Sequence, residues 1–416
     1  MGLFVDHVVL DGEAVRLRAE GGVVVGIGPD VAAEPGDELL DGQGMALVNG
    51  LINGHGHAAM TLLRGYGSDL QLHEWLHDKI FPAEARLTAD DVYWGTRLAA
   101  LEMIRSGTTH FYDMYWHPEA VARAAEASGL RATVGAPLFD GRDAAGIYAR
   151  TDTALESLEV LARFGPLISP SLTPHSIYLV SRESLEWVGS LAAERDLAIH
   201  IHLSETQREV DEWMIDHHVR PAAFADQCGL LGPRTILAHG CYLDAEELAL
   251  VASRGSTVVT NPVSNLKLAS GKVFPYPLAR SNGVAVGLGT DGASSNNSLD
   301  LFADLKTFAV LQKHEAGDPT VLPAAEALAV AQGRFSPLFA GQPIAVGAPA
   351  DFLLIDTELP HMLPGPLVDN LVYAGAGSAV DTTVVAGRVL MHRRQIEGAD
   401  EIVREARRCS ARLLNF

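Results

Sequence analysis

The feature that most constrains the fold is a regular alternation of short apolar segments with amphipathic helical patterns, between about residues 50 and 338. Amphipathic stretches such as residues 89–106, 181–195 and 244–254 separate segments with the length and composition of strands. Strands that alternate with helices form parallel sheets, and eight such units over roughly 250 residues suit a (β/α)8 TIM barrel. The eight expected strands cover residues 46–52, 108–112, 132–138, 167–172, 198–202, 235–239, 257–260 and 284–288.

Both ends of the chain differ from this middle part. They hold short strand patterns separated by turn pairs such as Asp11-Gly12 and Gly21-Gly22. We therefore expect residues 1–49 and 339–416 to form one small β-sandwich beside a barrel of residues 50–338. The strand patterns at the two ends cover residues 4–10, 14–19, 23–27, 38–41, 351–355, 382–385 and 387–390.

Composition and charge exclude several classes of protein. The 416 residues carry a net charge of −21 without a Lys/Arg-rich run, which argues against a nucleic-acid or acidic-membrane partner. No apolar stretch reaches the roughly 18 residues of a membrane span, and residues 1–6 form no basic export leader. The three cysteines are too few and too far apart for a disulfide framework or a Cys-based metal site. These features predict a cytoplasmic protein.

Metal-ligating side chains follow several of the expected strands at their C-terminal ends, where barrel enzymes keep their chemistry. His55 and His57 follow the first strand, His202 ends the fifth, His239 ends the sixth and Asp291 follows the eighth. One His at a strand end is ordinarily a hydrogen-bonded structural residue, and this chain has 16 His. The prediction of a metal site therefore depends on the whole set of residues and not on any one of them. His55, His57, His202 and Asp291 predict a Zn²⁺ site, with Fe²⁺ as the second candidate. A doubly wound sheet would not gather polar residues at so many strand ends.

Five stretches of the chain resemble the amidohydrolase superfamily, and within it the methylthioadenosine/S-adenosylhomocysteine deaminase branch. They are residues 55–65 (HGHAAMTLLRG), 173–176 (TPHS), 201–206 (IHLSET), 261–271 (NPVSNLKLASG) and 289–297 (GTDGASSNN). The resemblance covers essentially the whole chain. Guanine deaminases and triazine hydrolases share the last two stretches, which therefore indicate the chemistry rather than the substrate.

The resemblance implies one metal ion per subunit. Binuclear members of the superfamily bridge two metals with a carboxylated Lys on the fourth barrel strand. In this chain residues 167–172 contain no Lys and run on into His175. Members of this branch often form dimers or tetramers, so a homo-oligomer is compatible with the resemblance.

The resemblance also implies hydrolytic deamination of an adenosine-type nucleoside to the inosine analogue and ammonia. Asp291 is then both metal ligand and base for the attacking water. Glu205 protonates the ring nitrogen N1 and passes a proton to the departing ammonia. His239 is expected to hydrogen-bond the attacking water and to stabilise the tetrahedral intermediate.

Four further residues are expected to contact the substrate by the same resemblance. Trp75 and Glu84 lie in the loop after the first strand, and Glu84 accepts hydrogen bonds from the ribose 2′- and 3′-hydroxyls. His175 reaches the purine N3 or the ribose, and Ser295 touches the ring. Trp75 could equally be an ordinary core residue, and Glu84 a surface residue of a helix.

The group on the 5′ carbon is the least determined part of the substrate. Arg150 matches an arginine that binds the homocysteine carboxylate in relatives, but Ala136 stands where a second arginine is expected. Arg142, in the loop between them, is a candidate replacement. We therefore expect weak discrimination in favour of S-adenosylhomocysteine, with methylthioadenosine, adenosine, 5′-deoxyadenosine or another 5′-modified adenosine as rivals.

Two alternatives remain open from the sequence. The first is a guanine, pterin or s-triazine deaminase or a dechlorinase of the same superfamily, whose substrate offers no ribose to Glu84. The second is a non-catalytic barrel that binds a ligand without metal. The intact set of His55, His57, His202, His239, Asp291 and Glu205 argues against the second alternative.

Overall fold

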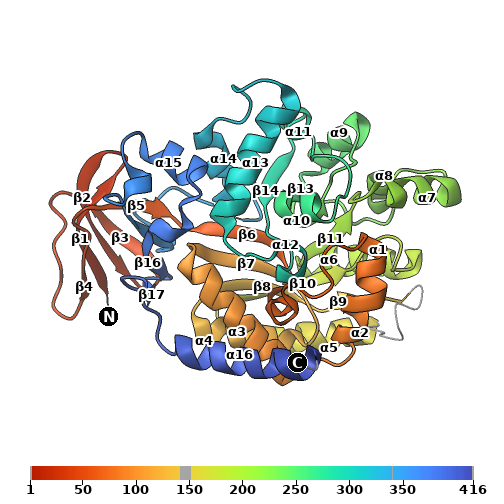
Figure 1. Ribbon diagram of the computed structural model, residues 1–416, viewed down its shortest axis with the longest axis horizontal. Helices are drawn as coiled ribbons and strands as arrows, with labels where there is room; N and C mark the ends of the chain where they lie inside the picture. Colours follow the sequence, from red (N-terminus) through yellow and green to blue (C-terminus); the bar gives the residue numbers. More distant parts are fainter. Residues whose placement is uncertain (1, 141–150, 340, 415–416) are drawn as a thin grey trace.

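The computed structural model describes residues 2–140, 151–339 and 341–414, and its centre is a parallel barrel (Figure 1). Hydrogen bonds from the segment after the last strand close the barrel onto the first: Asp291 N donates to His55 O at 3.1 Å, and Thr290 N to Asn53 Oδ1 at 3.0 Å. The predicted barrel is confirmed. The short strand β9 (Pro137–Leu138) pairs with the C-terminal end of β10. In order around the barrel lie β6 (Leu51–Gly56), β7 (Thr108–Met114), β8 (Arg131–Gly135), β10 (Ile168–Pro174), β11 (Ala198–Leu203), β12 (Thr235–His239), β13 (Thr257–Thr260) and β14 (Ala285–Leu288).

Helices follow the barrel strands and cover their outer faces (Figure 1). The predicted helical patterns over residues 89–106, 181–195 and 244–254 are confirmed, and α3 (Ala89–Arg105) begins at a capping box between Thr88 and Asp91. The helices between β7 and β14 are α4 (Pro118–Ser128), α5 (Thr151–Leu161), α6 (Arg182–Arg195), α7 (Gln207–His217), α8 (Pro221–Gln227), α9 (Ala245–Arg254), α10 (Pro262–Lys267) and α11 (Tyr276–Ser281). Between β6 and β7 lie η1 (Ala58–Leu63), α1 (Leu72–Trp75), η2 (Leu76–Ile80), α2 (Phe81–Glu84) and α3 (Ala89–Arg105), and after β14 come α12 (Ala293–Asn296), α13 (Leu301–Ala316) and α14 (Ala324–Ala331).

The two ends of the chain build a second sheet beside the barrel, as predicted (Figure 1). This sheet curls around its own core, which includes Val5, Leu17, Phe352 and Val384. Its strands are β1 (Leu3–Leu10), β2 (Glu13–Glu20), β3 (Val23–Gly28), β4 (Glu38–Asp41), β5 (Met45–Asn49), β15 (Phe352–Asp356), β16 (Val380–Val385) and β17 (Arg388–Met391). The same part of the chain holds η3 (Pro360–Met362), α15 (Leu367–Tyr373), η4 (Ala376–Ala379) and α16 (Ala399–Leu414).

The expected single strand over residues 46–52 is wrong. It is two strands, β5 in the terminal sheet and β6 in the barrel, and Gly50 lies between them. A side chain at Gly50 would collide with Thr109, because a Cβ there would lie 2.2 Å from Thr109 Oγ1. The break falls at the Asn49-Gly50 pair, a turn signal inside an otherwise apolar segment.

The C-terminal helix α16 packs against the barrel helix α3 rather than on the terminal sheet (Figure 1). Ser410 Oγ donates to Leu62 O at 2.8 Å, and Arg408 pairs with Asp90 at 2.7 Å. The domain boundaries at residues 49/50 and 338/339 stay a prediction. Within the described ranges no helix combines the length and apolar character needed to cross a membrane.

Candidate metal centre and active site

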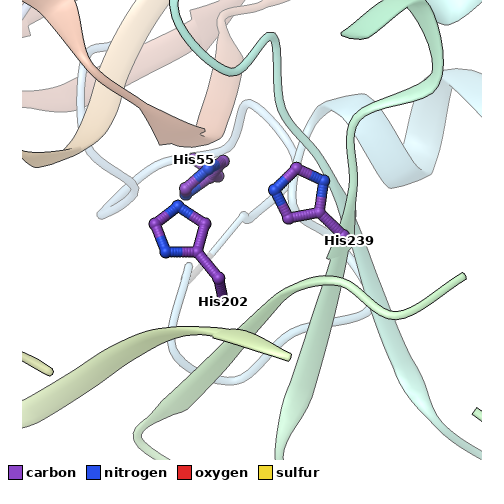
Figure 2. A group of neighbouring side chains, drawn as sticks. All are labelled: His55, His202 and His239. Atoms are coloured by element: carbon purple, nitrogen blue, oxygen red, sulfur yellow. The ribbon is translucent and has the colours of Figure 1, made fainter. Parts of the chain in front are cut away.

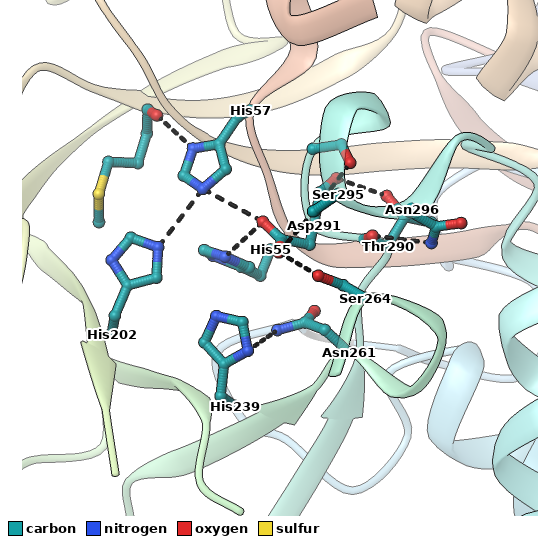
Figure 3. Close-up of polar contacts among 12 residues, drawn as sticks. His55, His57, His202, His239, Asn261, Ser264, Thr290, Asp291, Ser295 and Asn296 are labelled. Atoms are coloured by element: carbon teal, nitrogen blue, oxygen red, sulfur yellow. Dashed lines mark hydrogen bonds and ion pairs between the residues drawn. The ribbon is translucent and has the colours of Figure 1, made fainter. Parts of the chain in front are cut away.

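Four barrel strands deliver their terminal side chains to one point at the C-terminal mouth (Figures 2 and 3). His55 lies in β6 and His57 directly follows this strand, two residues apart on the extended chain and therefore on the same face. His202 comes from β11, His239 ends β12 and Asp291 follows β14. All five are buried or nearly so, so their polar atoms face one another away from bulk water.

Three separations among the facing atoms match those around a tetrahedral ion. Asp291 Oδ1 lies 3.4 Å from His55 Nε2 and 3.3 Å from His57 Nε2. His202 Nε2 lies 3.4 Å from His57 Nε2. Ligand atoms about 2.0–2.1 Å from a tetrahedral zinc lie about 3.3 Å apart. These three distances are compatible with one metal ion between the side chains.

Each of the three predicted imidazole ligands is fixed by a second contact at Nδ1. A ring whose Nδ1 carries the proton presents the Nε2 lone pair to a metal. The His55 Nε2 atom is buried without a hydrogen-bond partner among the described residues, as expected of a metal ligand. The Nδ1 partners, each at 2.7 Å, are His200 Nε2 for His55, Met114 O for His57 and His175 O for His202.

Asp291 is fixed in the same manner through its second oxygen (Figure 3). Ser264 Oγ donates to Oδ2 at 2.6 Å and Ser295 Oγ donates to Oδ2 at 2.9 Å. Burial opposes ionisation, but the neighbouring His55 and His57 rings outweigh it and hold the pKa of Asp291 well below its usual range. Oδ1 is therefore a negatively charged oxygen turned toward the His rings.

His239 stands beside this group, and its ring is oriented by an amide. Its Nδ1 lies 2.8 Å from Asn265 Oδ1, closer than the 3.4 Å to Asn261 Nδ2. An amide oxygen only accepts, so Nδ1 carries the proton and Nε2 carries a lone pair. Asn265 Nδ2 in turn donates to Cys241 Sγ at 3.1 Å. One nitrogen each of His55, His202 and His239 lies within 4.8 Å of the others, so His239 borders the metal position (Figure 2).

Next to the metal position is a partly open pocket. His57, His202 and Asp291 form one part of its wall, together with Glu205. Burial raises the pKa of Glu205, which favours the protonated form that an acid needs. Apolar and aromatic side chains make up most of the remaining wall, including Leu72, Trp75, Leu76, Ile80, Phe81, Trp116, Pro137, Phe139 and Leu268.

Glu84 also lines this cavity, and one of its oxygens is unsatisfied. Trp116 Nε1 donates to Oε2 at 3.1 Å, whereas Oε1 is buried without a hydrogen-bond partner in the described chain. Glu84 is 7% exposed, which excludes the alternative of an ordinary surface residue. Burial raises its pKa. A buried carboxylate oxygen beside a cavity is suited to accept a ligand hydroxyl.

The remaining predicted contact residues are placed as follows. Trp75 is buried and lines the cavity, as does His175, whose ring lies 4.7 Å from Phe139 and 4.5 Å from His202 between centroids. Ser295 donates to Asp291, so its contact with a substrate ring stays a prediction. Arg142 and Arg150 lie outside the described residues.

Several residues of the site were not predicted from the sequence. Trp116, Phe139 and Asn265 carry no local signal, because their partners are distant in the sequence. His200 does carry one, since it stands two residues before His202 and shares its face of β11. The resemblance stretch 261–271 contained Asn265 and Ser264 without assigning them a role.

Comparison with known proteins agrees with this geometry. The model of the amidohydrolase family matches residues 46–390. The chain is 49% identical over 381 residues to the 5′-deoxyadenosine deaminase of Methanoregula boonei, covering 90% of this chain and 86% of the relative. It is 39% identical over 404 residues to 5-methylthioadenosine/S-adenosylhomocysteine deaminase 1 of Archaeoglobus fulgidus, covering 96% and 95%. The crystal structure of an adenosine deaminase from Xanthomonas campestris with bound zinc superposes with a TM-score of 0.92 at 33% identity, over 100% of this chain and 98% of that one.

Proposed function

The chain belongs to the amidohydrolase family, and on that premise we propose that it deaminates adenosine-type nucleosides hydrolytically, with release of ammonia and the inosine analogue. The observation that carries the proposal is that facing atoms of His55, His57, His202 and Asp291 converge, with three of their separations at 3.3–3.4 Å, beside a cavity that Glu205 and Glu84 line. The named relatives at 39% and 49% identity support the same reaction class.

We propose zinc as the resident metal, held by His55, His57, His202 and Asp291, one ion per chain. When bound, the ion supplies a Lewis acid that lowers the pKa of a water toward neutrality. Three nitrogens and one carboxylate oxygen favour zinc over harder cations. Fe²⁺ is the second candidate, and metal analysis of the purified protein distinguishes the two. A homo-oligomer and a cytoplasmic location stay predictions.

The proton transfers follow from the chain's own side chains. The Asp291 carboxylate is ionised at neutral pH and accepts the proton of the attacking water. Protonated Glu205 donates to N1 of the adenine ring, which makes C6 more electrophilic, and a proton then passes to the amino group so that it leaves as ammonia. His239 Nε2 accepts a hydrogen bond from the attacking water. This bond orients the water so that a lone pair of the water oxygen points toward C6. Stabilisation of the tetrahedral intermediate by His239 requires a second proton on the ring and stays a prediction.

Among the rival substrates we propose 5′-deoxyadenosine. Of the described residues that line the cavity, none is Lys or Arg, and Arg142 and Arg150 lie outside the described residues. The apolar wall suits a small uncharged 5′ group, and the relative at 49% identity carries the name 5′-deoxyadenosine deaminase. Ala136 is consistent with this preference, because alanine supplies no charge at the position where an arginine was expected.

A substrate panel with zinc-loaded protein tests the proposal. Ammonia release and the change in adenine absorbance are measured for 5′-deoxyadenosine, methylthioadenosine, adenosine, S-adenosylhomocysteine, guanine, a pterin and an s-triazine. We expect 5′-deoxyadenosine to have the highest kcat/KM, about 10-fold or more above S-adenosylhomocysteine, the selectivity of one charged hydrogen bond. Turnover of guanine, the pterin or the triazine, together with no turnover of any nucleoside, would establish the alternative of a guanine, pterin or s-triazine deaminase or a dechlorinase. Zinc-loaded protein that turns over nothing would establish the non-catalytic one.

A further inference from the structure

Glu209 makes an unusual pair of contacts beside the active site. It lies in the first turn of α7, four residues after Glu205, and is half-buried. Its Oε1 accepts the backbone N–H of Ser204 at 2.8 Å, and its Oε2 accepts the backbone N–H of Glu205 at 2.8 Å. One carboxylate therefore holds the two peptide groups on either side of Ser204, and the second of these joins Ser204 to the acid residue Glu205.

These contacts go beyond helix capping. Thr206 is the N-cap of α7, and its hydroxyl already accepts from Glu209 N at 3.1 Å. In a capping box the carboxylate of the third helical residue returns to the N–H of the N-cap residue itself. Here it reaches past Thr206 to the two residues before the cap. The carboxylate therefore fixes the turn between β11 and α7.

The turn needs contacts that hold it in place because its backbone is strained. Ser204 has a φ of +52°, a left-handed conformation that side-chain-bearing residues rarely adopt. The Ser204 carbonyl is held from the other side, since it accepts from Tyr242 N at 3.0 Å. Both sides of this peptide unit are thus fixed by residues outside the turn.

The direction of the Glu205 side chain depends on this backbone. Its Oε1 lies 3.9 Å from His239 Nδ1, beyond hydrogen-bond distance, and within the described chain its carboxylate makes no hydrogen bond. When a carboxylate makes no hydrogen bond, its direction is determined by the position of its Cα and by its rotamer. A shift of the peptide at residue 205 would therefore move the acid relative to the ring that it protonates.

We propose that Glu209 is a positioning residue, which holds the Ser204–Glu205 turn so that Glu205 points at the reacting ring. The proposal rests on the proposed function, in which Glu205 is the acid. It assigns Glu209 an effect on the rate of the chemical step, with little effect on substrate binding or on the metal ligands.

The test is Glu209→Gln, which keeps the length of the side chain. Its single amide oxygen can accept one N–H, while its NH₂ group faces the other N–H donor to donor. Glu212→Gln is the matched control, because Glu212 lies on the same helix, is exposed and pairs with Arg208. Hydrogen exchange of the peptide that contains residues 203–206, zinc content, and kcat and KM on the best nucleoside are measured for both variants.

We expect exchange in residues 203–206 to accelerate in Glu209→Gln and kcat to fall about 10-fold or more, with KM within about threefold, and the zinc content unchanged. Glu212→Gln should match the wild type in all four readouts. Unchanged hydrogen exchange in Glu209→Gln would show that Glu209 does not hold the turn, and this measurement needs no substrate. Unchanged kcat, or a loss of zinc in parallel with kcat, would overturn the positioning role. Failure of the wild type on every nucleoside would instead overturn the proposed function.

Discussion

At the residue scale, the side chains nearest the chemistry sit on strained backbone. His239 has a φ of +73° and Asp291 a φ of +61°, and Ser204 precedes the acid residue with a similar value. Each such residue costs roughly 1 kcal/mol or more, so it persists only where surrounding contacts hold it. For Asp291 these contacts are the two serine hydroxyls and the hydrogen bond from its N–H to His55 O. The strain turns these side chains out of the sheet toward a common centre.

Removing the Glu84 carboxylate should abolish selectivity for the ribose diol. The one charged hydrogen bond from the 2′-hydroxyl to Glu84 distinguishes ribose from 2′-deoxyribose by about 1.5–3 kcal/mol, or about 10- to 150-fold in kcat/KM. Both substrates lose the bond from the 3′-hydroxyl in Glu84→Ala, so we expect kcat/KM to fall further for adenosine than for 2′-deoxyadenosine, by this factor. Steady-state kinetics on the two substrates provides the check. Equal losses on both would show that Glu84 does not contact the 2′-hydroxyl.

The pH dependence should report Glu205. Burial raises its pKa, so the protonated acid persists to a higher pH than for an exposed glutamate. Activity that requires this proton is therefore present below the raised pKa and is lost as the pH rises through it. The pKa of Asp291 is lowered, so its carboxylate remains ionised throughout the neutral range. We expect kcat/KM to decline on the alkaline side, with zinc content verified at each pH. A kcat/KM that rises steadily with pH would contradict Glu205 as the acid.

The metal ligands were predictable from the sequence, but the residues that orient them were mostly not. His55, His57, His202 and Asp291 stand at strand ends, and the barrel brings all strand ends to one face. Asn265 and Trp116 act through partners that are distant in sequence, and no periodic pattern records such pairs. The sequence identifies which residues lie at the C-terminal mouth of the barrel, whereas tertiary packing determines the hydrogen-bond partner of each polar atom.

At the element scale, the site depends on how tightly β14 closes onto β6. Gly289 lies immediately after β14, and a Cβ there would meet Asn261 Oδ1 at 2.4 Å, His55 O at 2.9 Å and His55 N at 3.0 Å. Two of these atoms are backbone and cannot swing aside. The absence of a side chain at Gly289 allows Asp291 to approach the His55 ring.

Gly289→Ala should therefore weaken metal binding. We expect the segment after β14 to move away from β6, so that Asp291 no longer meets His55 and His57. The zinc content after dialysis at low zinc should fall well below one ion per chain, together with the Tm. Gly232→Ala is the control, because a Cβ at Gly232 meets nothing within 4 Å and its φ is not left-handed. Full zinc retention by Gly289→Ala would refute this account of the closure.

The elements themselves followed from periodicity, with errors where two elements adjoin. β4, β12 and β13 begin and end at the predicted residues, because turns or polar residues bound each apolar run. Residues 46–52 were expected as one strand because apolar residues lie on both sides of the Asn49-Gly50 pair at which the sheets change. Residues 132–138 likewise divide into β8 and β9, between Gly135 and Pro137.

At the scale of the whole molecule, the terminal sheet is attached to the barrel by polar contacts as well as by packing. Thr383 Oγ1 on β16 donates to Ile104 O on α3 at 2.8 Å. Arg131, at the start of β8, forms a bidentate pair with Asp351, with Nε to Oδ2 at 2.6 Å and Nη2 to Oδ1 at 3.2 Å. This end of β8 is opposite the catalytic mouth, so these contacts affect stability without touching the chemistry.

Arg131→Ala should lower stability and leave catalysis intact. The pair is mostly buried, with side-chain exposures of 25% and 18%, and the Asp351 carboxylate would keep only the hydrogen bond from Ala386 N at 2.7 Å. Losing two charged hydrogen bonds from a partly desolvated carboxylate should cost about 1–3 kcal/mol. The Tm should fall by a few degrees, while kcat and zinc content remain at wild-type values. Arg234→Ala removes an exposed pair with Asp196, with exposures of 46% and 83%, and should change the unfolding free energy by less than about 0.5 kcal/mol. If the two variants lose the same stability, the Arg131–Asp351 pair is no more than a surface contact, and packing alone attaches the sheet.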